Sequence, residues 1–120
     1  MALTLSHTTK IAALALILSP MSAHAIECTF TTECFESESC GESAFNISIE
    51  ERDGQTVLVG DAETIPVSVG GNDTVRIYVG VTESAFHLMS RAANGVARYS
   101  THIYDGPIMV NYLGNCEGAE

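Results

Sequence analysis

The sequence predicts an all-β fold: a single small antiparallel β-meander of about seven or eight strands, barrel-like or sandwich, after an N-terminal signal peptide. The dipeptides Asn94-Gly95 and Asp105-Gly106 lie between alternating apolar runs, which is the strongest short-range signal for β-hairpins. Other short apolar runs recur at regular intervals, and residues 26–120 show no helical periodicity. Because nearly every connection reads as a hairpin, a meander that closes into a barrel-like sheet is favoured.

Residues 1–25 have the pattern of a secretory signal peptide. Lys10 supplies the positive charge, residues 11–18 form a short apolar core, and Ala23-His24-Ala25 fits the small-x-small cleavage pattern. The apolar run is too short to span a bilayer, and no lipid-attachment motif precedes Cys28. We therefore expect a periplasmic or secreted protein without membrane insertion after signal cleavage.

The expected mature domain, residues 26–120, contains all four cysteines of the chain, and an even number in an exported chain predicts disulfides. Of three possible connectivities, the preferred one joins a local pair and a pair that ties the domain ends together: Cys34 with Cys40, and Cys28 with Cys116. The chain-entropy relation assigns roughly 4–5 kcal/mol to the long loop and roughly 2–3 kcal/mol to the short one.

The charge of the mature domain narrows the class of partner. After signal cleavage four arginines stand against fifteen carboxylates and no lysine remains, which is a formal charge of −11. Such a balance argues against nucleic acid and anionic membrane surfaces. A basic protein is the natural class of partner, and simple solubility is the alternative reason for the acidity.

The middle of the chain predicts further strands. Alternating apolar residues at Ile65, Val67 and Val69 form one strand, and Pro66 places it at a sheet edge because proline cannot donate a ladder hydrogen bond. A three-residue loop would set Val67 against Val75 and Ile65 against Ile77.

The segment 86–113 allows a register to be predicted. If Asn94-Gly95 is a two-residue turn, His87 faces His102 and Arg91 faces Arg98, while Asp105-Gly106 sets Tyr99 against Tyr112. The predicted core face is Phe86, Leu88, Tyr99, Ile103, Ile108, Val110 and Tyr112. The predicted outer face is His87, Met89, Arg91, Arg98, His102 and Met109.

The predicted outer face contains the candidate site residues. A cross-strand pair of His87 and His102 could share a Zn²⁺, Cu²⁺ or Ni²⁺ ion, with Met89 and Met109 nearby as ligands suited to Cu(I). Two half-exposed surface histidines are the alternative. Arg91 and Arg98, facing each other beside Met89, could bind carboxylates of a partner, or they could splay apart at the hairpin end.

The run from Leu88 to Tyr99, Leu-Met-Ser-Arg-Ala-Ala-Asn-Gly-Val-Ala-Arg-Tyr, resembles the Ser-Gly-x-x-Tyr region of the periplasmic inhibitors of C-type lysozyme. The resemblance covers about a tenth of the chain and implies a small disulfide-bonded β-barrel whose outer loop binds the enzyme. The layout from export signal to the final Tyr-Leu-Gly-Asn-Cys-Glu, residues 112–117, also resembles small exported bacterial proteins.

Enzyme motifs are absent from the sequence: it has no nucleophile elbow, no zinc-protease motif and no phosphate-binding glycine loop. The leading expectation is a non-enzymatic exported domain that binds another macromolecule, such as a lysozyme-like cell-wall hydrolase. No cofactor is expected. The alternatives are a metal-binding protein using His87 and His102, and an enzyme of another type.

Overall fold

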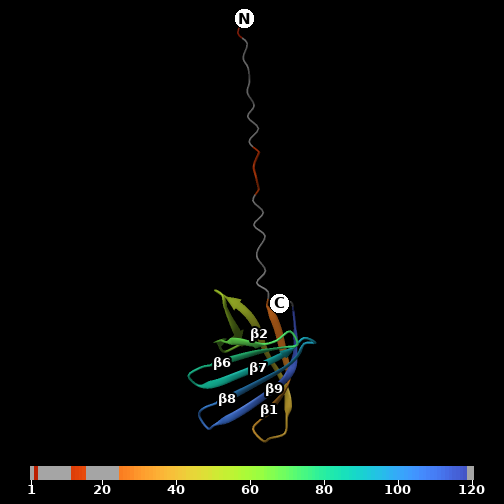
Figure 1. The fold of residues 1–120 in the computed structure, drawn as a ribbon, viewed down its shortest axis with the longest axis vertical. Coiled ribbons are helices and arrows are strands. Elements are labelled where there is room, and N and C mark those ends of the chain that lie inside the picture. Colours follow the sequence, from red (N-terminus) through yellow and green to blue (C-terminus); the bar gives the residue numbers. More distant parts are fainter. Residues whose placement is uncertain (1, 3–11, 16–24, 119–120) are drawn as a thin grey trace.

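The computed structural model describes residue 2, residues 12–15 and residues 25–118. Its nine strands are β1 (Ile26–Phe35), β2 (Gly41–Arg52), β3 (Gln55–Val59), β4 (Thr64–Pro66), β5 (Ser68–Gly71), β6 (Val75–Val81), β7 (Ala85–Ala92), β8 (Val96–Ile103) and β9 (Ile108–Glu117) (Figure 1). The described residues contain no helix, so the predicted all-β class is confirmed. The predicted signal peptide lies almost entirely outside the described residues.

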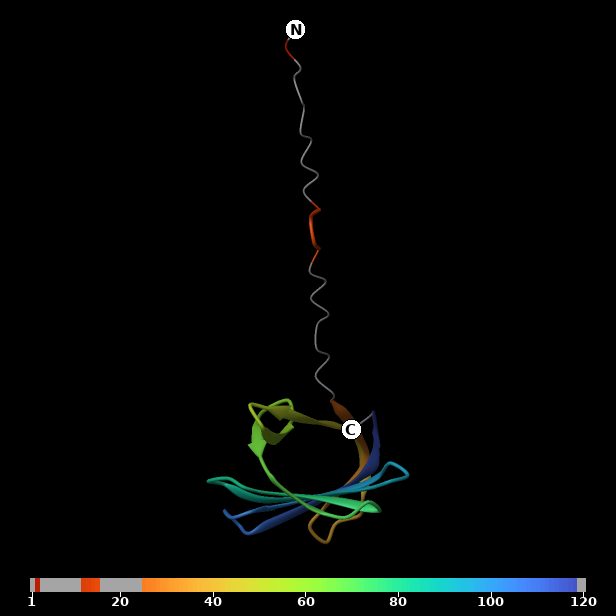
Figure 2. The same ribbon diagram turned by 45° about the horizontal axis from the view of Figure 1, so that its top comes forward.

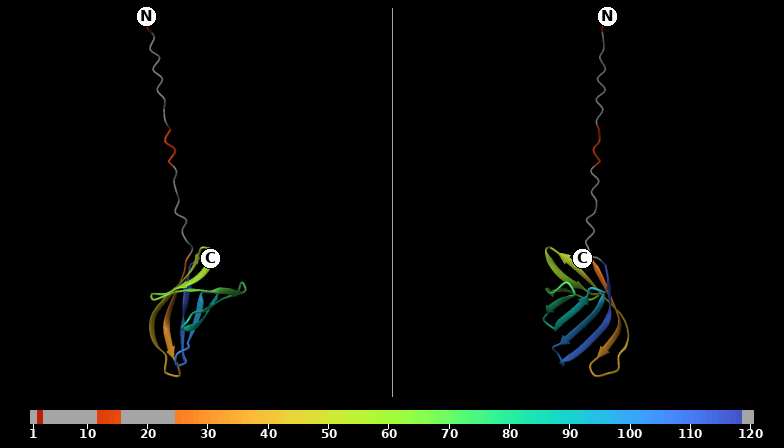
Figure 3. Two further views of the ribbon diagram at one scale, coloured as in Figure 1. Left: turned by 90° about the vertical axis from the view of Figure 1, so that its left-hand side faces the viewer. Right: turned by 45° about the vertical axis from the view of Figure 1, so that its right-hand side comes forward.

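All nine strands form one antiparallel sheet in the order β4-β3-β2-β1-β9-β8-β7-β6-β5. Consecutive strands are neighbours in the sheet, except that β4 and β5 lie at its two opposite edges. In addition, β1 pairs with β9 and brings the two ends of the domain together. The sheet curls until its two edges approach each other, which gives the barrel-like ring in Figure 2 and the steeply inclined strands in Figure 3. The predicted meander is therefore a nearly closed barrel.

The barrel closes through a corner at Val67. The chain leaves β4 at one edge of the sheet and enters β5 at the other edge, so one predicted strand becomes two. The Val67 N–H donates to the Thr56 carbonyl, and the Gln55 side chain donates to the Val67 carbonyl, so β3 satisfies both backbone groups of the corner. Pro66 lies in edge strand β4, as its missing N–H predicts.

The corner makes the predicted pairing of residues 65–69 with residues 75–79 wrong. The observed register places Ser68 opposite Val79 and Gly70 opposite Ile77. Ile65 and Val67 do not pair with β6; instead they are buried in the core. The apolar pattern of residues 65–69 is continuous, but residues 64–66 pair with β3 whereas residues 68–71 pair with β6.

The predicted register between β7 and β8 is also wrong, by one residue. Residues 93–95 form a three-residue loop, in which the Gly95 N–H donates to the Ala92 carbonyl and Gly95 has a φ of 94°. A three-residue loop that ends in a left-handed glycine is the second common hairpin type. Because side chains alternate along a strand, this slip exchanges the two faces of β7. Met89 is 0 % exposed, and Leu88, expected in the core, is 39 % exposed.

The register between β8 and β9 is confirmed. Tyr99 lies opposite Tyr112, Thr101 opposite Val110 and Ile103 opposite Ile108, as the turn at Asp105-Gly106 predicts. Tyr99 and Val110 are buried in the barrel. The predicted inner and outer faces of β8 and β9 are therefore correct. Only on β7 are the inward-facing and outward-facing side chains exchanged.

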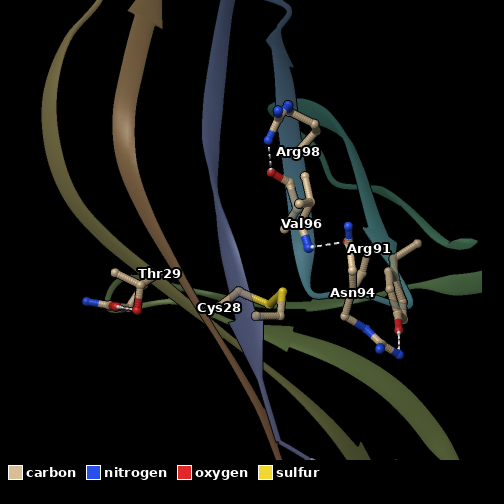
Figure 4. Close-up of a disulfide and its surroundings, with 10 residues drawn as sticks. Cys28, Thr29, Arg91, Asn94, Val96 and Arg98 are labelled. Carbon is tan, nitrogen blue, oxygen red and sulfur yellow. Dashed lines mark hydrogen bonds between the residues drawn. A yellow bond between two sulfur atoms is a disulfide. The ribbon is translucent and has the colours of Figure 1, made fainter.

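The core fills the interior of the barrel. Phe30 lies at its centre, with its ring centroid about 6 Å from those of Phe45, Tyr99 and Tyr112. The disulfides join Cys28 to Cys116 and Cys34 to Cys40, which is the preferred pairing. The first of these links β1 to β9 across the line where the domain ends meet (Figure 4).

A substitution at Gly80 is expected to weaken the closure of the barrel. A Cβ at this position of β6 would lie 2.6 Å from Ile65 Cγ2 and 3.1 Å from the Pro66 carbonyl oxygen. Gly80→Ala should therefore cost about 1–3 kcal/mol of unfolding free energy, because the corner must move outward. Chemical denaturation measures the loss. Gly70→Ala is the matched control, since no described atom lies within 4 Å of its added Cβ, and an equal loss there would contradict the assignment.

Candidate functional site

A hollow opens at the end of the barrel that is formed by the turns after β3, β6 and β8. It has a volume of about 270 Å³. Side chains from β2, β7, β8, β9 and the β3–β4 and β6–β7 turns line it: Phe45, Glu63, Ser84, Ala85, His87, Tyr99, Thr101, Ile103 and Tyr112. We call this the mouth hollow. It combines aromatic walls with one imidazole and one carboxylate.

His87 is the most unusual side chain of the mouth hollow. It is 3 % exposed, and its Nδ1 lies 2.5 Å from the hydroxyl oxygen of Tyr99. Its Nε2 is buried and has no hydrogen-bond partner among the described residues; the nearest carboxylate oxygen, Glu63 Oε1, lies 3.9 Å away. Burial lowers the pKa of His87, although the Glu63 carboxylate opposes that shift. The ring is therefore neutral at pH 7.

Three aromatic rings form the walls. Phe45 lies 4.8 Å from Tyr112 and 6.0 Å from Tyr99, measured between ring centroids, and the two tyrosine rings are 5.6 Å apart. Burial, with the Glu63 carboxylate, raises the pKa of Tyr99. Burial also raises the pKa of Tyr112, and Glu33 adds to this shift through its charge and a hydrogen bond. Both hydroxyls therefore keep their protons at neutral pH.

A second, smaller hollow of about 130 Å³ adjoins the first and shares Phe45, Glu63 and Tyr99 with it. Its remaining walls are mostly apolar: Ile47, Leu58, Gly60, Asp61, Ala62 and Ile65. Glu63 thus lies between the two hollows. Its side chain is 50 % exposed, so its carboxylate can move without unpacking the core.

The predicted metal pair does not form. His87 faces Thr101 inside the barrel, whereas His102 faces Phe86 on the outside, with the ring centroids of His102 and Phe86 6.3 Å apart. The one-residue slip of β7 separates the two imidazoles onto opposite sides of the sheet. Among the described residues no group of three or more His, Cys, Asp or Glu side chains could hold a metal ion.

The predicted partner-binding residues are also divided. Arg91 faces Ala97 rather than Arg98, and its guanidinium donates to the Tyr78 hydroxyl. Arg98 stays on the outside and donates to the carbonyl of Ala97; Figure 4 shows the two arginines apart, on different strands. Met89 is fully buried, so it is not available to a partner in the folded protein.

The slip places apolar side chains on the outside instead. Phe86 lies opposite Val81, and Leu88 lies opposite Val79, on the outer faces of β6 and β7. Ile77 adds a third position on β6, and Met109 lies in the row of Phe86 and His102. We call the set Ile77, Val79, Val81, Phe86, Leu88 and Met109 the outer apolar patch. Val81 is its most exposed member, at 69 %.

Sequence reasoning missed Glu63 and Phe45 as site residues. Glu63 follows a short strand and precedes Ile65 by two positions, and no motif marks it. Only the corner at Val67 brings the β3–β4 turn next to β7. His87 is one of two histidines in residues 26–120, which makes it a candidate in the sequence, but its inward direction depends on the length of the β7–β8 loop.

Below neutral pH, the buried ring of His87 is expected to destabilise the fold. Its pKa is lowered in the folded protein, so the unfolded chain takes up a proton first, near the ordinary value of 6.5. The stabilising contribution of the neutral ring is therefore complete above pH 6.5 and is lost as the pH falls toward the folded pKa. Urea unfolding between pH 7.5 and 5 measures this loss.

His87→Gln should flatten that part of the pH dependence, whereas His102→Gln, on the exposed outer face, should leave it in place. An equal slope in the protein and in His87→Gln would contradict the assignment to His87.

The fold and the mouth hollow define a small disulfide-bonded, barrel-like all-β protein. Comparisons with protein-family models, with curated proteins and with solved structures find no match for this chain. The described residues contain no helix long and apolar enough to cross a membrane.

Proposed function

We propose that this chain is a non-enzymatic exported domain that binds a basic protein through the outer apolar patch. The observation that carries the proposal is the patch itself. A solvated face of an antiparallel sheet normally presents polar side chains, whereas β6 and β7 present valine, isoleucine, leucine and phenylalanine there. Contiguous exposed apolar side chains commonly mark an interaction surface.

Charge supports the choice of a basic partner. Fifteen acidic residues stand against five basic ones in the whole chain. Two of the acids, Glu83 and Asp105, are exposed in the β6–β7 and β8–β9 turns. These turns border the patch at the end of the barrel where the mouth hollow opens. Acidic groups at the rim of an apolar patch accelerate and orient the approach of a cationic protein. Both disulfides and the signal-peptide pattern of residues 1–25 are compatible with a partner outside the cytoplasm.

A C-type lysozyme is the concrete partner class to test first, because it is a cationic cell-wall hydrolase. Calorimetric titration of the oxidised protein at about 10 mM salt is expected to give a Kd of about 10 µM or tighter. Raising the salt to about 150 mM should weaken binding, because it screens the attraction between the two surfaces. Absence of binding to every cationic cell-wall hydrolase at low salt would remove this class of partner.

The patch is tested by the double substitution Phe86→Ser and Leu88→Ser. We expect binding to weaken at least about 10-fold, because both side chains lose apolar contact area. Thr29→Ser, on the exposed face of β1, is the matched control and should bind like the parent. Unchanged binding by the double variant would place the interface elsewhere on the protein.

A further inference from the structure

We propose that the mouth hollow binds a protonated primary or secondary amine carried on a small apolar body. The site lies inside the barrel and shares no residue with the outer apolar patch, so this proposal stands independently of the proposed function. It rests on the buried Nε2 of His87, on the charge around the mouth and on the three aromatic walls.

The buried Nε2 of His87 points to a missing hydrogen-bond partner. Buried polar atoms are almost always hydrogen-bonded, and an unpaired one costs free energy. Nδ1 is already paired with the Tyr99 hydroxyl, and a side-chain hydrogen bond joins Tyr99 to Thr101. In the tautomer in which Nδ1–H donates to the Tyr99 oxygen, Nε2 is left as an acceptor. An acceptor in this position can take a hydrogen bond from an N–H or O–H group of a ligand.

The charge around the mouth favours an N–H group on a cation. Glu63 lines both hollows, and Asp61 lines the smaller one. Glu33 is hydrogen-bonded to Tyr112, which lines the mouth hollow. No arginine or lysine is among the residues found to line either hollow. A carboxylate ligand would be repelled, whereas an ammonium group gains from the same charges.

The aromatic walls suit the same chemistry. Phe45, Tyr99 and Tyr112 form one cluster, and an ammonium group over an aromatic face is attracted by the electrons of the ring. The apolar walls of the smaller hollow, including Ile47 and Leu58, would receive the body of the ligand. The hollow of about 270 Å³ is smaller than the roughly 300–1,000 Å³ typical of drug-sized ligands, so the body must be small.

Glu63 would move on binding. Its Oε1 lies 3.9 Å from His87 Nε2, and an ammonium nitrogen that donates to both at about 2.8 Å holds its acceptors about 4.6 Å apart. The half-exposed Glu63 side chain can make this shift, because it belongs to a turn rather than to a strand. A quaternary ammonium has no N–H to offer and would leave Nε2 unpaired. This difference separates amine recognition from attraction by charge alone.

The test titrates the oxidised protein with benzylamine, benzyltrimethylammonium and benzyl alcohol at pH 7.5, following the ring signals of His87, Tyr99 and Tyr112 by NMR. Benzylamine is expected to shift all three sets of signals and to bind at least about 5-fold more tightly than either analogue. Undetectable binding of benzylamine, or equal binding of benzyl alcohol or of the quaternary analogue, overturns the proposal.

Two variants locate the site. Glu63→Gln should weaken benzylamine at least about 10-fold, because it removes the charge beside Nε2. Glu83→Gln is the matched control, since Glu83 lies outside both hollows, and it should leave the affinity unchanged. Equal weakening by both variants would show attraction to the overall charge and would overturn the site.

Nα-acetyl-lysine methylamide, used as a further probe, distinguishes the two sources of an alkylammonium group. Binding as tight as that of benzylamine assigns the site to a lysine side chain of a protein. Binding of benzylamine alone assigns it to a free amine. Both results support recognition of an amine. If Glu63→Gln loses the binding of benzylamine and of the lysine derivative, the amine is recognised in the mouth hollow.

Discussion

Replacing both Cys28 and Cys116 with alanine is expected to lower the unfolding free energy by about 4–5 kcal/mol. The two residues are separated by 88 positions, and a loop of this length loses much of its conformational freedom in the unfolded chain when it is closed. They are also direct neighbours across β1 and β9, where the first and last strands complete the barrel. Such a loss is a large part of the 5–15 kcal/mol typical of a small domain.

Urea unfolding of the oxidised protein and of the double variant measures this effect. The matched control is the double substitution Cys34→Ala and Cys40→Ala, which opens a loop of only six positions and should cost roughly 2–3 kcal/mol. If the second pair cost as much as the first, loop length would not explain the stabilisation. The closure of β1 on β9 would then have to depend on other contacts.

Gly114→Ala is expected to cost at least about 3 kcal/mol, because the added methyl group has no space. A Cβ at Gly114 would lie 2.0 Å from the carbonyl oxygen of Thr29 and 2.6 Å from Cα of Phe30. Both are backbone atoms of β1, so no side-chain rotation relieves the clash. The β1–β9 register shifts between Phe30 and Thr32, beside this contact, and the strands would have to separate there.

Thermal unfolding should show a Tm lower by roughly 12 °C or more for Gly114→Ala. Gly41→Ala is the matched control, because no described atom lies within 4 Å of its added Cβ, and it should change the stability by less than about 0.5 kcal/mol. A folded Gly114→Ala with the stability of the parent would mean that β1 and β9 are further apart than the structure places them.

The local signals of the sequence were sufficient for the fold class and for the disulfides. Turn dipeptides and period-two alternation depend on neighbouring residues, so they predicted the hairpins and the β8–β9 register. The cysteine pairing followed from the need to tie the ends of the domain together, and the structure joins Cys28 to Cys116.

Which face of β7 points into the barrel could not be predicted in the same way. Its alternate positions are apolar on both sides, with Phe86 and Leu88 on one and Met89 on the other, so the hydrophobic pattern permits either register. The three-residue loop that ends at Gly95 decides between them. That choice sends His87 inward and exposes the outer apolar patch.

The sequence by itself therefore determined an antiparallel meander with two disulfides, because these features depend on turn chemistry, alternation and cysteine number. Only the tertiary structure decided which side chains share a site. Glu63 and His87 are 24 positions apart and meet because the chain turns at Val67 and closes the sheet into a barrel. The closure depends on the packing of distant strands, and no local pattern in the sequence carries that information.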